Sequence, residues 1–287
     1  MQFINDENIH MPRKTAVSIG KFDGLHLGHM SLIKETKKIA KNRGLATVIL
    51  SFSPHPSVFL SGRPMPLILT TEEKIHLLDN LGIDYYIEYP FTQKFAQTNP
   101  EDFIKNILIS QLRCNALVVG QNFRYGKNGE GDVALAQKLG NQFEFTLHVK
   151  SHVEHNGEKV SSENIRPLVT QQDFAKFAAL AGRNFFLLGR PDNNGDIFPN
   201  SGKTLPPPGI YAVVAHLDGF AYPTTATIYS LNQKTKPPLA TNRPSNFASG
   251  EPELSLASTT SSKIHLDVSS DLLEKTLRID FHKHIGR

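Results

Sequence analysis

Two histidines three residues apart, His26 and His29, stand in a glycine-bearing segment, GKFDGLHLGH, at residues 20–29. The segment lies between an apolar run typical of a buried strand, 16–20, and a helical pattern, 31–44. A helix start offers unpaired N–H groups and a positive dipole end, which favour an anionic phosphate. Imidazoles there can stabilise the charge that develops during transfer at an α-phosphate. The histidine pair taken alone leaves a solvated turn or a weak metal site as alternatives.

The surrounding sequence alternates between strand and helix patterns. Apolar runs at 46–52, 84–91 and 115–120 read as strands, and the segments 72–82 and 99–112 read as helices. Such alternation implies crossover connections and a parallel sheet covered on both faces. We therefore predict an α/β fold with a doubly wound, Rossmann-like parallel sheet, whose ligand crevice lies beyond the carboxyl ends of the strands.

The decapeptide resembles the signature of the HxGH nucleotidylyltransferase superfamily, in the form carried by bacterial FAD synthetases (riboflavin kinase/FMN adenylyltransferase). The likeness covers residues 14–186 and continues through the segments SFSPHP, LTTEEKIHLLDNLGID, FAQTNPEDFIKNIL, VVGQNFRYGKNGEGD, VSSENIR and LAGRNF. It implies a HUP/Rossmann-like nucleotidylyltransferase domain at 1–185. The implied reaction transfers AMP from MgATP to FMN and releases FAD and pyrophosphate.

The resemblance also implies the site residues. It assigns catalysis to His26, His29 and Arg166, and it brings in Mg²⁺ with ATP rather than at a metal site of the protein. It assigns ATP binding to Gly20, Phe22, Asp23, Gly24, Gly28, Ser161 and Ser162, and FMN binding to Pro54, His55, Pro56, Asn122, Phe123, Arg124 and Tyr125.

The residue types at several of these positions suit the implied roles. Ser161 and Ser162 can cap a helix and present hydroxyls to phosphates, and Arg166 can neutralise a phosphate as a fork donor. The residue types leave a structural role open for Asp23, and they leave a core position open for Phe123.

Two positions depart from the family pattern. Asn122 replaces an acidic residue, and Glu163 replaces a threonine beside the expected triphosphate. A carboxylate at that place weakens ATP binding unless Mg²⁺ or Lys127 offsets its charge.

Beyond Arg183 the composition changes, and a second domain of mostly β structure is expected at 186–287. Residues 189–209 are rich in Gly, Pro and Asn, and 232–262 form an insertion rich in Ser, Thr and Pro. The segments GIYAVV and KIHLDV resemble strands of the riboflavin kinase barrel, which implies a smaller β-barrel domain.

This barrel lacks residues that kinase chemistry needs. Asn200 stands where the kinase family carries a threonine, the adjoining loop is several residues shorter, and Lys263 occupies the position of the catalytic glutamate. A lysine that is protonated near neutrality cannot act as a general base. We therefore expect the riboflavin kinase activity to be absent or very weak.

Composition restricts the partners. The formal net charge of +4 is small and spread along the chain, so no nucleic-acid partner is expected. The chain has one cysteine, Cys114, which reads as a buried core thiol. No apolar signal stretch stands at the start, and no run approaches the ~18 apolar residues of a membrane helix. We expect a cytoplasmic protein whose partners are FMN and ATP, with no membrane; the oligomeric state does not follow from the sequence.

Three other functions stay open at this point. The chain could be a bifunctional riboflavin kinase/FMN adenylyltransferase, or a non-catalytic protein that binds flavin nucleotides. It could also be a superfamily member acting on a nicotinate or phosphopantetheine nucleotide, which the PHP and NFRYG segments disfavour.

Overall fold

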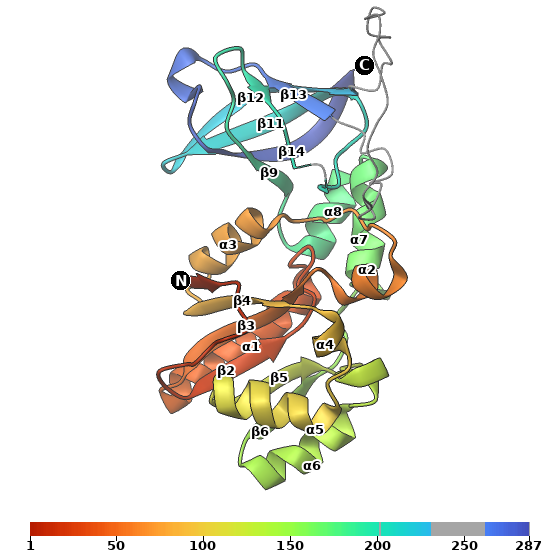
Figure 1. The fold of residues 1–287 in the computed structure, drawn as a ribbon. Helices are drawn as coiled ribbons and strands as arrows, with labels where there is room; N and C mark the ends of the chain where they lie inside the picture. Colours follow the sequence, from red (N-terminus) through yellow and green to blue (C-terminus); the bar gives the residue numbers. More distant parts are fainter. Residues whose placement is uncertain (201, 231–261, 287) are drawn as a thin grey trace, which may run out of the picture. The chain divides into compact units, whose positions relative to one another are not determined.

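The computed structural model describes residues 1–200, 202–230 and 262–286, and the chain divides into two compact units, Met1–Phe185 and Phe186–Arg287. The first unit is built on a parallel sheet with helices, and the second on an antiparallel sheet (Figure 1). The predicted fold class, α/β with a smaller barrel-like domain, is confirmed.

The sheet of the first unit has six parallel strands in the order β1-β4-β3-β2-β5-β6. Its central strands β2, β3 and β5 are mostly apolar and are buried along most of their length, which is the pattern of parallel strands covered on both faces. The strands are β1 (Gln2–Ile4), β2 (Thr15–Ile19), β3 (Ala46–Ser53), β4 (Tyr85–Pro90), β5 (Cys114–Gly120) and β6 (Thr146–Lys150).

Helices cover both faces of this sheet, and alternate strand residues face opposite sides. Ala16 and Val118 pack with Ile39 of α1, whereas Val17 and Leu117 belong to the larger apolar cluster on the other face. The predicted helix 99–112 is a short α-helix that continues as a π-helix. The helical segments are α1 (Leu27–Arg43), α2 (Pro56–Ser61), α3 (Thr71–Asn80), α4 (Gln93–Ala96), α5 (Pro100–Asp102), η1 (Phe103–Gln111), η2 (Lys127–Gly129), α6 (Val133–Phe143), α7 (Ser162–Thr170) and α8 (Phe174–Ala181). A hairpin, β7 (Glu154–His155) and β8 (Glu158–Lys159), precedes α7.

The strand order reverses at β2, which has β3 on one side and β5 on the other. In open α/β sheets such a reversal opens a crevice beyond the carboxyl ends of the strands. The loop from Gly20 to His26 leaves β2 at this point and enters α1. The topology therefore places the histidine segment where ligands bind in this class of fold.

The second unit is a curled antiparallel sheet of six strands in the order β10-β13-β12-β11-β14-β9. Its core contains Tyr211 and Phe281, whose rings pack edge to face with their centroids 5.7 Å apart. Of the predicted insertion 232–262, all but Ser262 lies outside the described residues. The elements are β9 (Phe185–Gly189), β10 (Asp196–Ile197), β11 (Gly209–Leu217), β12 (Phe220–Ser230), β13 (Ser262–Leu266), η3 (Ser270–Leu272) and β14 (Leu277–Gly286).

Candidate active site

His26 and His29 form a stacked pair at the start of α1. His26 is the N-cap residue of this helix, and its Nδ1 accepts a hydrogen bond from the backbone N–H of His29 at 3.4 Å. The two imidazole rings lie with their centroids 3.8 Å apart and their planes 20° from parallel. A Cβ at Gly28 would come within 3.0 Å of the His26 ring, so the glycine between the histidines makes room for this arrangement.

Both imidazoles are neutral at pH 7. Burial lowers the pKa of His26 to about 4, with Asp23 opposing the shift and Arg183 adding to it. Burial also lowers the pKa of His29 well below its usual value, and the neighbouring His26 and Arg183 lower it further. Because Nδ1 of His26 accepts a hydrogen bond, the ring proton is assigned to Nε2, which can donate to a phosphate oxygen.

Asp23 is engaged by the protein on both carboxylate oxygens. Oδ1 accepts from the backbone N–H of Ile68 at 2.9 Å and of Leu69 at 3.4 Å, and Oδ2 lies 2.7 Å from Nη2 of Arg166. The carbonyl of Asp23 accepts a further hydrogen bond from the hydroxyl of Ser162. Asp23 thus joins the loop from Gly20 to His26, called the histidine loop below, to α7 and to the segment before α3.

The start of α7 lies beside the histidine loop. Ser161 caps this helix by accepting from the N–H of Asn164 at 3.3 Å, which leaves its hydroxyl proton to donate. The hydroxyl of Ser162 is already committed to Asp23, and Glu163 is exposed in the first turn. Arg166 keeps a buried Nε without a hydrogen-bond partner among the described residues. Asp23 therefore contacts both Ser162 and Arg166 of α7, although it lies 139 and 143 positions from them in the sequence.

The PHP segment caps a short helix, α2. Nδ1 of His55 accepts from the N–H of Ser57 at 3.1 Å, and the Ser57 hydroxyl accepts from Nζ of Lys21 at 3.4 Å. Burial lowers the pKa of His55 to about 4, with smaller contributions from charges that include Lys21 and Arg166. These contacts place His55 near the loop from Gly20 to His26, whereas Pro56 lines the apolar pocket described next.

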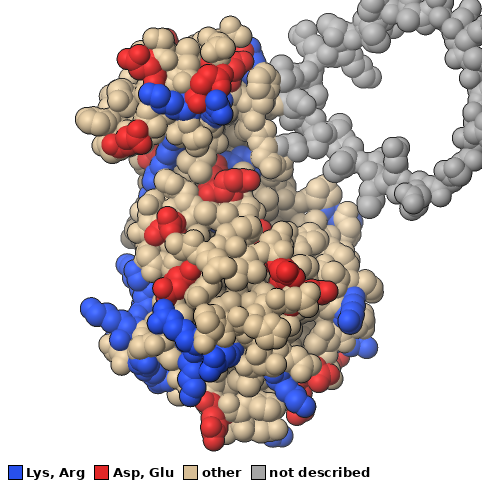
Figure 2. Space-filling view, turned by 60° about the vertical axis from the view of Figure 1, so that its left-hand side comes forward, with Lys and Arg blue, Asp and Glu red and all other residues tan. Residues whose placement is uncertain are grey.

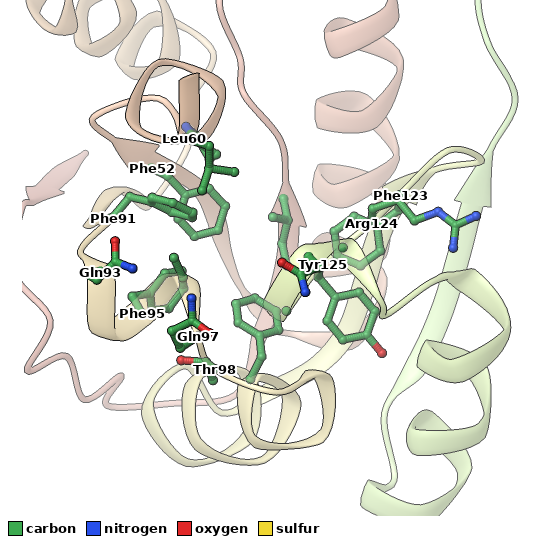
Figure 3. A pocket seen from close by; sticks show the side chains of 17 residues that line it. Phe52, Leu60, Phe91, Gln93, Phe95, Gln97, Thr98, Phe123, Arg124 and Tyr125 are labelled. Carbon is green, nitrogen blue, oxygen red and sulfur yellow. The ribbon is translucent and has the colours of Figure 1, made fainter. Parts of the chain in front are cut away.

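An aromatic pocket of about 270 Å³ opens at the carboxyl edge of the sheet (Figure 3). The rings of Phe123 and Tyr125 stack at 5.0 Å on one side, and Phe91 and Phe95 stand on the other. Such a slot suits a flat aromatic ligand. The lining residues are Ile19, Phe52, Pro56, Leu60, Phe91, Gln93, Phe95, Ala96, Gln97, Thr98, Phe103, Phe123, Arg124, Tyr125, Gly126, Asn128 and Gly129.

Some predicted residues lie apart from this pocket. Asn122 contacts Nε2 of His152 at 3.0 Å and lines a separate, more open hollow that Phe123 and Arg124 also border. Pro54 does not line the pocket.

Sequence reasoning missed two groups of residues. One is the set of pocket side chains from Phe91 to Thr98, whose signal is two phenylalanines four residues apart, Phe91 and Phe95, at the end of the predicted strand 84–91. The other is Arg183, whose Nη2 donates to the carbonyl of Gly24 at 2.7 Å. Arg183 belongs to the LAGRNF match, but its residue type and position gave no sign of that contact.

Surface and fold features add two negative findings for the described residues. No described helix is long and apolar enough to cross a membrane. Within the same residues, no three His, Cys, Asp or Glu side chains group as metal ligands.

Basic side chains gather over part of the first unit, with acidic ones beside them, on the face that Figure 2 shows.

Comparisons with known proteins show which family this chain is similar to. The FAD synthetase family model matches residues 8–164. A bifunctional riboflavin kinase/FMN adenylyltransferase from Listeria monocytogenes is 33% identical over 226 residues, which are 74% of this chain and 71% of that protein. A protein of the same name from Buchnera aphidicola (subsp. Schizaphis graminum) is 36% identical over 178 residues, 61% of this chain and 57% of that protein. The match thus spans less than two thirds of the Buchnera protein.

A solved structure shares the fold. It is described as a macrolide-efflux protein from Streptococcus pneumoniae, and it superposes with a TM-score of 0.73 over 99% of this chain and 98% of its own. The identity is 20%, so this likeness shows the fold alone.

The Rossmann-like sheet and the family match define an enzyme of the nucleotidyltransferase class. Within that class, the chain belongs to the FAD synthetase family. The family predicted from GKFDGLHLGH and the segments after it is therefore confirmed.

Proposed function

We propose that this protein makes FAD by transferring AMP from ATP to FMN. The observation that carries the proposal is the neutral, stacked pair His26 and His29 at the start of α1, on the same sheet edge as the aromatic pocket. The pocket is the place for the flavin ring system, and the helix start is the place for the ATP phosphates.

The reaction needs no nucleophile from the protein. An oxygen of the FMN phosphate attacks the α-phosphorus of ATP, a new P–O bond forms, and the bond from the α-phosphorus to the bridging oxygen breaks. Pyrophosphate leaves with the electron pair of that bond. The FMN phosphate is ionised at neutral pH, so catalysis consists of positioning and of stabilising charge on the phosphate oxygens.

The protein's own residues divide this task. His26 accepts a hydrogen bond at Nδ1 and so keeps its Nε2 proton to donate a hydrogen bond to a phosphate oxygen, and the Ser161 hydroxyl can donate another from the start of α7. Arg166 supplies positive charge, with a buried Nε that lacks a partner among the described residues. Asp23 holds the other side of that guanidinium at 2.7 Å.

Mg²⁺ fits this site as an ion carried by ATP. The described residues gather no set of three carboxylate, imidazole or thiolate ligands, and Mg²⁺ commonly binds through substrate phosphates and water. When bound, the ion would neutralise charge on the phosphate chain.

The test is formation of FAD and pyrophosphate from FMN and MgATP by the purified protein. His26→Ala should lower kcat by roughly 10²-fold or more, because it removes a phosphate donor. His10→Ala is the matched control, since His10 is exposed and outside the site. Tight binding of FMN without any pyrophosphate would instead support the non-catalytic flavin-nucleotide binder.

We further propose that the second unit has lost riboflavin kinase activity. Nζ of Lys263 lies 2.9 Å from Asp196, and its hydrogen bond lowers the pKa of that carboxyl group. The side-chain oxygen of Asn200 accepts from the N–H of Gly202 at 2.9 Å, so it closes its own turn. An ion-paired lysine cannot remove a proton from a riboflavin hydroxyl.

Incubation with riboflavin and MgATP tests this second proposal, with FMN as the acceptor in a parallel reaction on the same preparation. We expect FAD from FMN and no FMN from riboflavin. Conversion of riboflavin to FMN would show that the chain is bifunctional.

A further inference from the structure

Arg183 lies beside the histidine loop, because the residue before it packs on α1 and its own side chain donates a hydrogen bond to the loop. The preceding residue, Gly182, ends α8 in the left-handed conformation, and a Cβ there would come within 2.8 Å of Leu27. The end of α8 therefore packs directly on the first residue of α1. The Arg183 guanidinium donates to the Gly24 carbonyl at 2.7 Å and lies 5.7 Å from the centre of the Phe177 ring.

The loop that Arg183 contacts has an unusual backbone. Phe22, Gly24 and Leu25 all have positive φ, at 47°, 87° and 39°. Non-glycine residues adopt such values only where surrounding contacts hold them. A Cβ at Gly24 would come within 2.9 Å of Ile165, so this turn is also tightly enclosed.

Two consecutive carbonyl groups of the loop are held from outside it. The Asp23 carbonyl accepts from the Ser162 hydroxyl, and the Gly24 carbonyl accepts from Arg183. These donors come from the start of α7 and from the residue after the α8 cap. The orientation of both peptide planes is thus determined just before His26.

The charge of Arg183 acts on the same pair of histidines. Burial is the main cause of the low pKa of His26 and of His29, and Arg183 lowers both pKa values further. Asp23 opposes the shift at His26, and His26 adds to the shift at His29. The contact between Arg183 and Gly24 therefore coincides with an electrostatic effect that keeps the pair neutral.

We propose that Arg183 is a positioning residue of the AMP-transfer site. By holding the Gly24 carbonyl, it fixes the loop that leads into His26 and into the first turn of α1, where His29 lies. This inference rests on the proposed function, and it assigns Arg183 no contact with either substrate.

Three substitutions separate the hydrogen bond from the charge. Arg183→Ala removes both, Arg183→Gln keeps a neutral N–H donor, and Arg183→Lys keeps a charged donor. For Arg183→Ala we expect kcat to fall roughly 10- to 100-fold while KM for FMN stays within about twofold, because other segments line the pocket. Arg183→Lys should recover most of kcat, and Arg183→Gln should recover part of it.

A second readout does not depend on turnover. NMR titration of the imidazole protons, assigned through His26→Asn and His29→Asn, reports the two pKa values directly. Loss of the charge should raise both values in Arg183→Ala and Arg183→Gln and leave them unchanged in Arg183→Lys. Lys176→Ala, which removes the exposed ion pair between Lys176 of α8 and Glu158 of β8, is the control and should change neither readout.

The outcomes separate the inference from the proposed function. Absence of FAD synthesis by the unaltered protein would refute the function, whereas the titrations would still report on Arg183. A kcat for Arg183→Ala within twofold of the unaltered protein would overturn the inference. So would a loss that Arg183→Lys fails to restore in folded protein. If Arg183→Ala does not fold, Arg183→Met carries the same comparison, because it keeps a long side chain but has neither the N–H donor nor the charge.

Discussion

Nη2 of Arg166 lies 2.7 Å from Oδ2 of Asp23, and this ion pair joins α7 to the loop that carries the histidines. Asp23 is buried, and the Arg166 side chain is 18% exposed. The pair therefore fixes the arginine in an orientation that free rotation about its four side-chain bonds would not maintain.

Replacing Asp23 with Asn should damage both stability and activity. Removing one member of a buried ion pair costs about 3 kcal/mol, because the other charge is left uncompensated. We expect a lower free energy of unfolding in urea and a reduced kcat, with KM for FMN little changed. Glu158→Gln, which removes one carboxylate of the exposed ion pair with Lys176, is the control for stability. Unchanged stability in Asp23→Asn would contradict the role given to this pair.

Acid should destabilise the protein through its buried histidines. The pKa of His26 is about 4 in the folded protein and near 6.5 when unfolded, so only the unfolded chain takes up this proton between those values. The free energy of unfolding should therefore fall as pH falls from 6.5 to 4. In His26→Gln the slope should be smaller by roughly 1.4 kcal/mol per pH unit in that window. Equal slopes, measured by urea unfolding at several pH values, would show that His26 titrates normally.

Gly28 should not tolerate even a methyl group. A Cβ at this position lies 3.0 Å from both Cε1 and Nδ1 of His26, so Gly28→Ala must displace that imidazole. We expect a loss in kcat of roughly tenfold or more, with little change in thermal stability. Gly44→Ala is not a matched control, because Gly44 has a left-handed φ of 64°. Gly120→Ala is better matched, since its Cβ would meet nothing within 4 Å; full activity in Gly28→Ala would argue against the stacked pair.

The aromatic pocket should determine affinity for FMN. Phe95→Ala removes a ring that contacts Phe91 and Phe103 and lines the cavity. We expect KM for FMN to rise roughly 10-fold or more, and KM for ATP to stay near its original value. Phe198→Ala, at an exposed ring of the second unit, should change neither constant. An effect of Phe95→Ala confined to ATP would reassign the pocket.

The elements of the first unit follow from local sequence patterns. The apolar runs 46–52 and 115–120 are β3 and β5, and VSSENIR does begin a helix at Ser162. These features depend on periodicity and capping, which act over a few residues. The π-helical form of 103–111 depends on packing and could not be predicted from the same patterns.

Only part of the candidate site could be predicted from the sequence. GKFDGLHLGH indicated the histidines because both lie in one ten-residue segment, which spans the end of the loop and the start of α1. The contacts of Arg183 with Gly24 and of Asp23 with Ile68 join residues 159 and 45 positions apart. Such pairs become neighbours only when the strands and helices pack, so no local pattern encodes them.

Labelled ATP tests the central claim most directly, with FMN as the acceptor. ATP labelled with ³²P at the α-phosphate should transfer its label to FAD, and ATP labelled at the γ-phosphate should place its label in pyrophosphate. His26→Ala should slow both, while His10→Ala should slow neither. If no α-label enters the flavin, the protein does not transfer AMP to FMN.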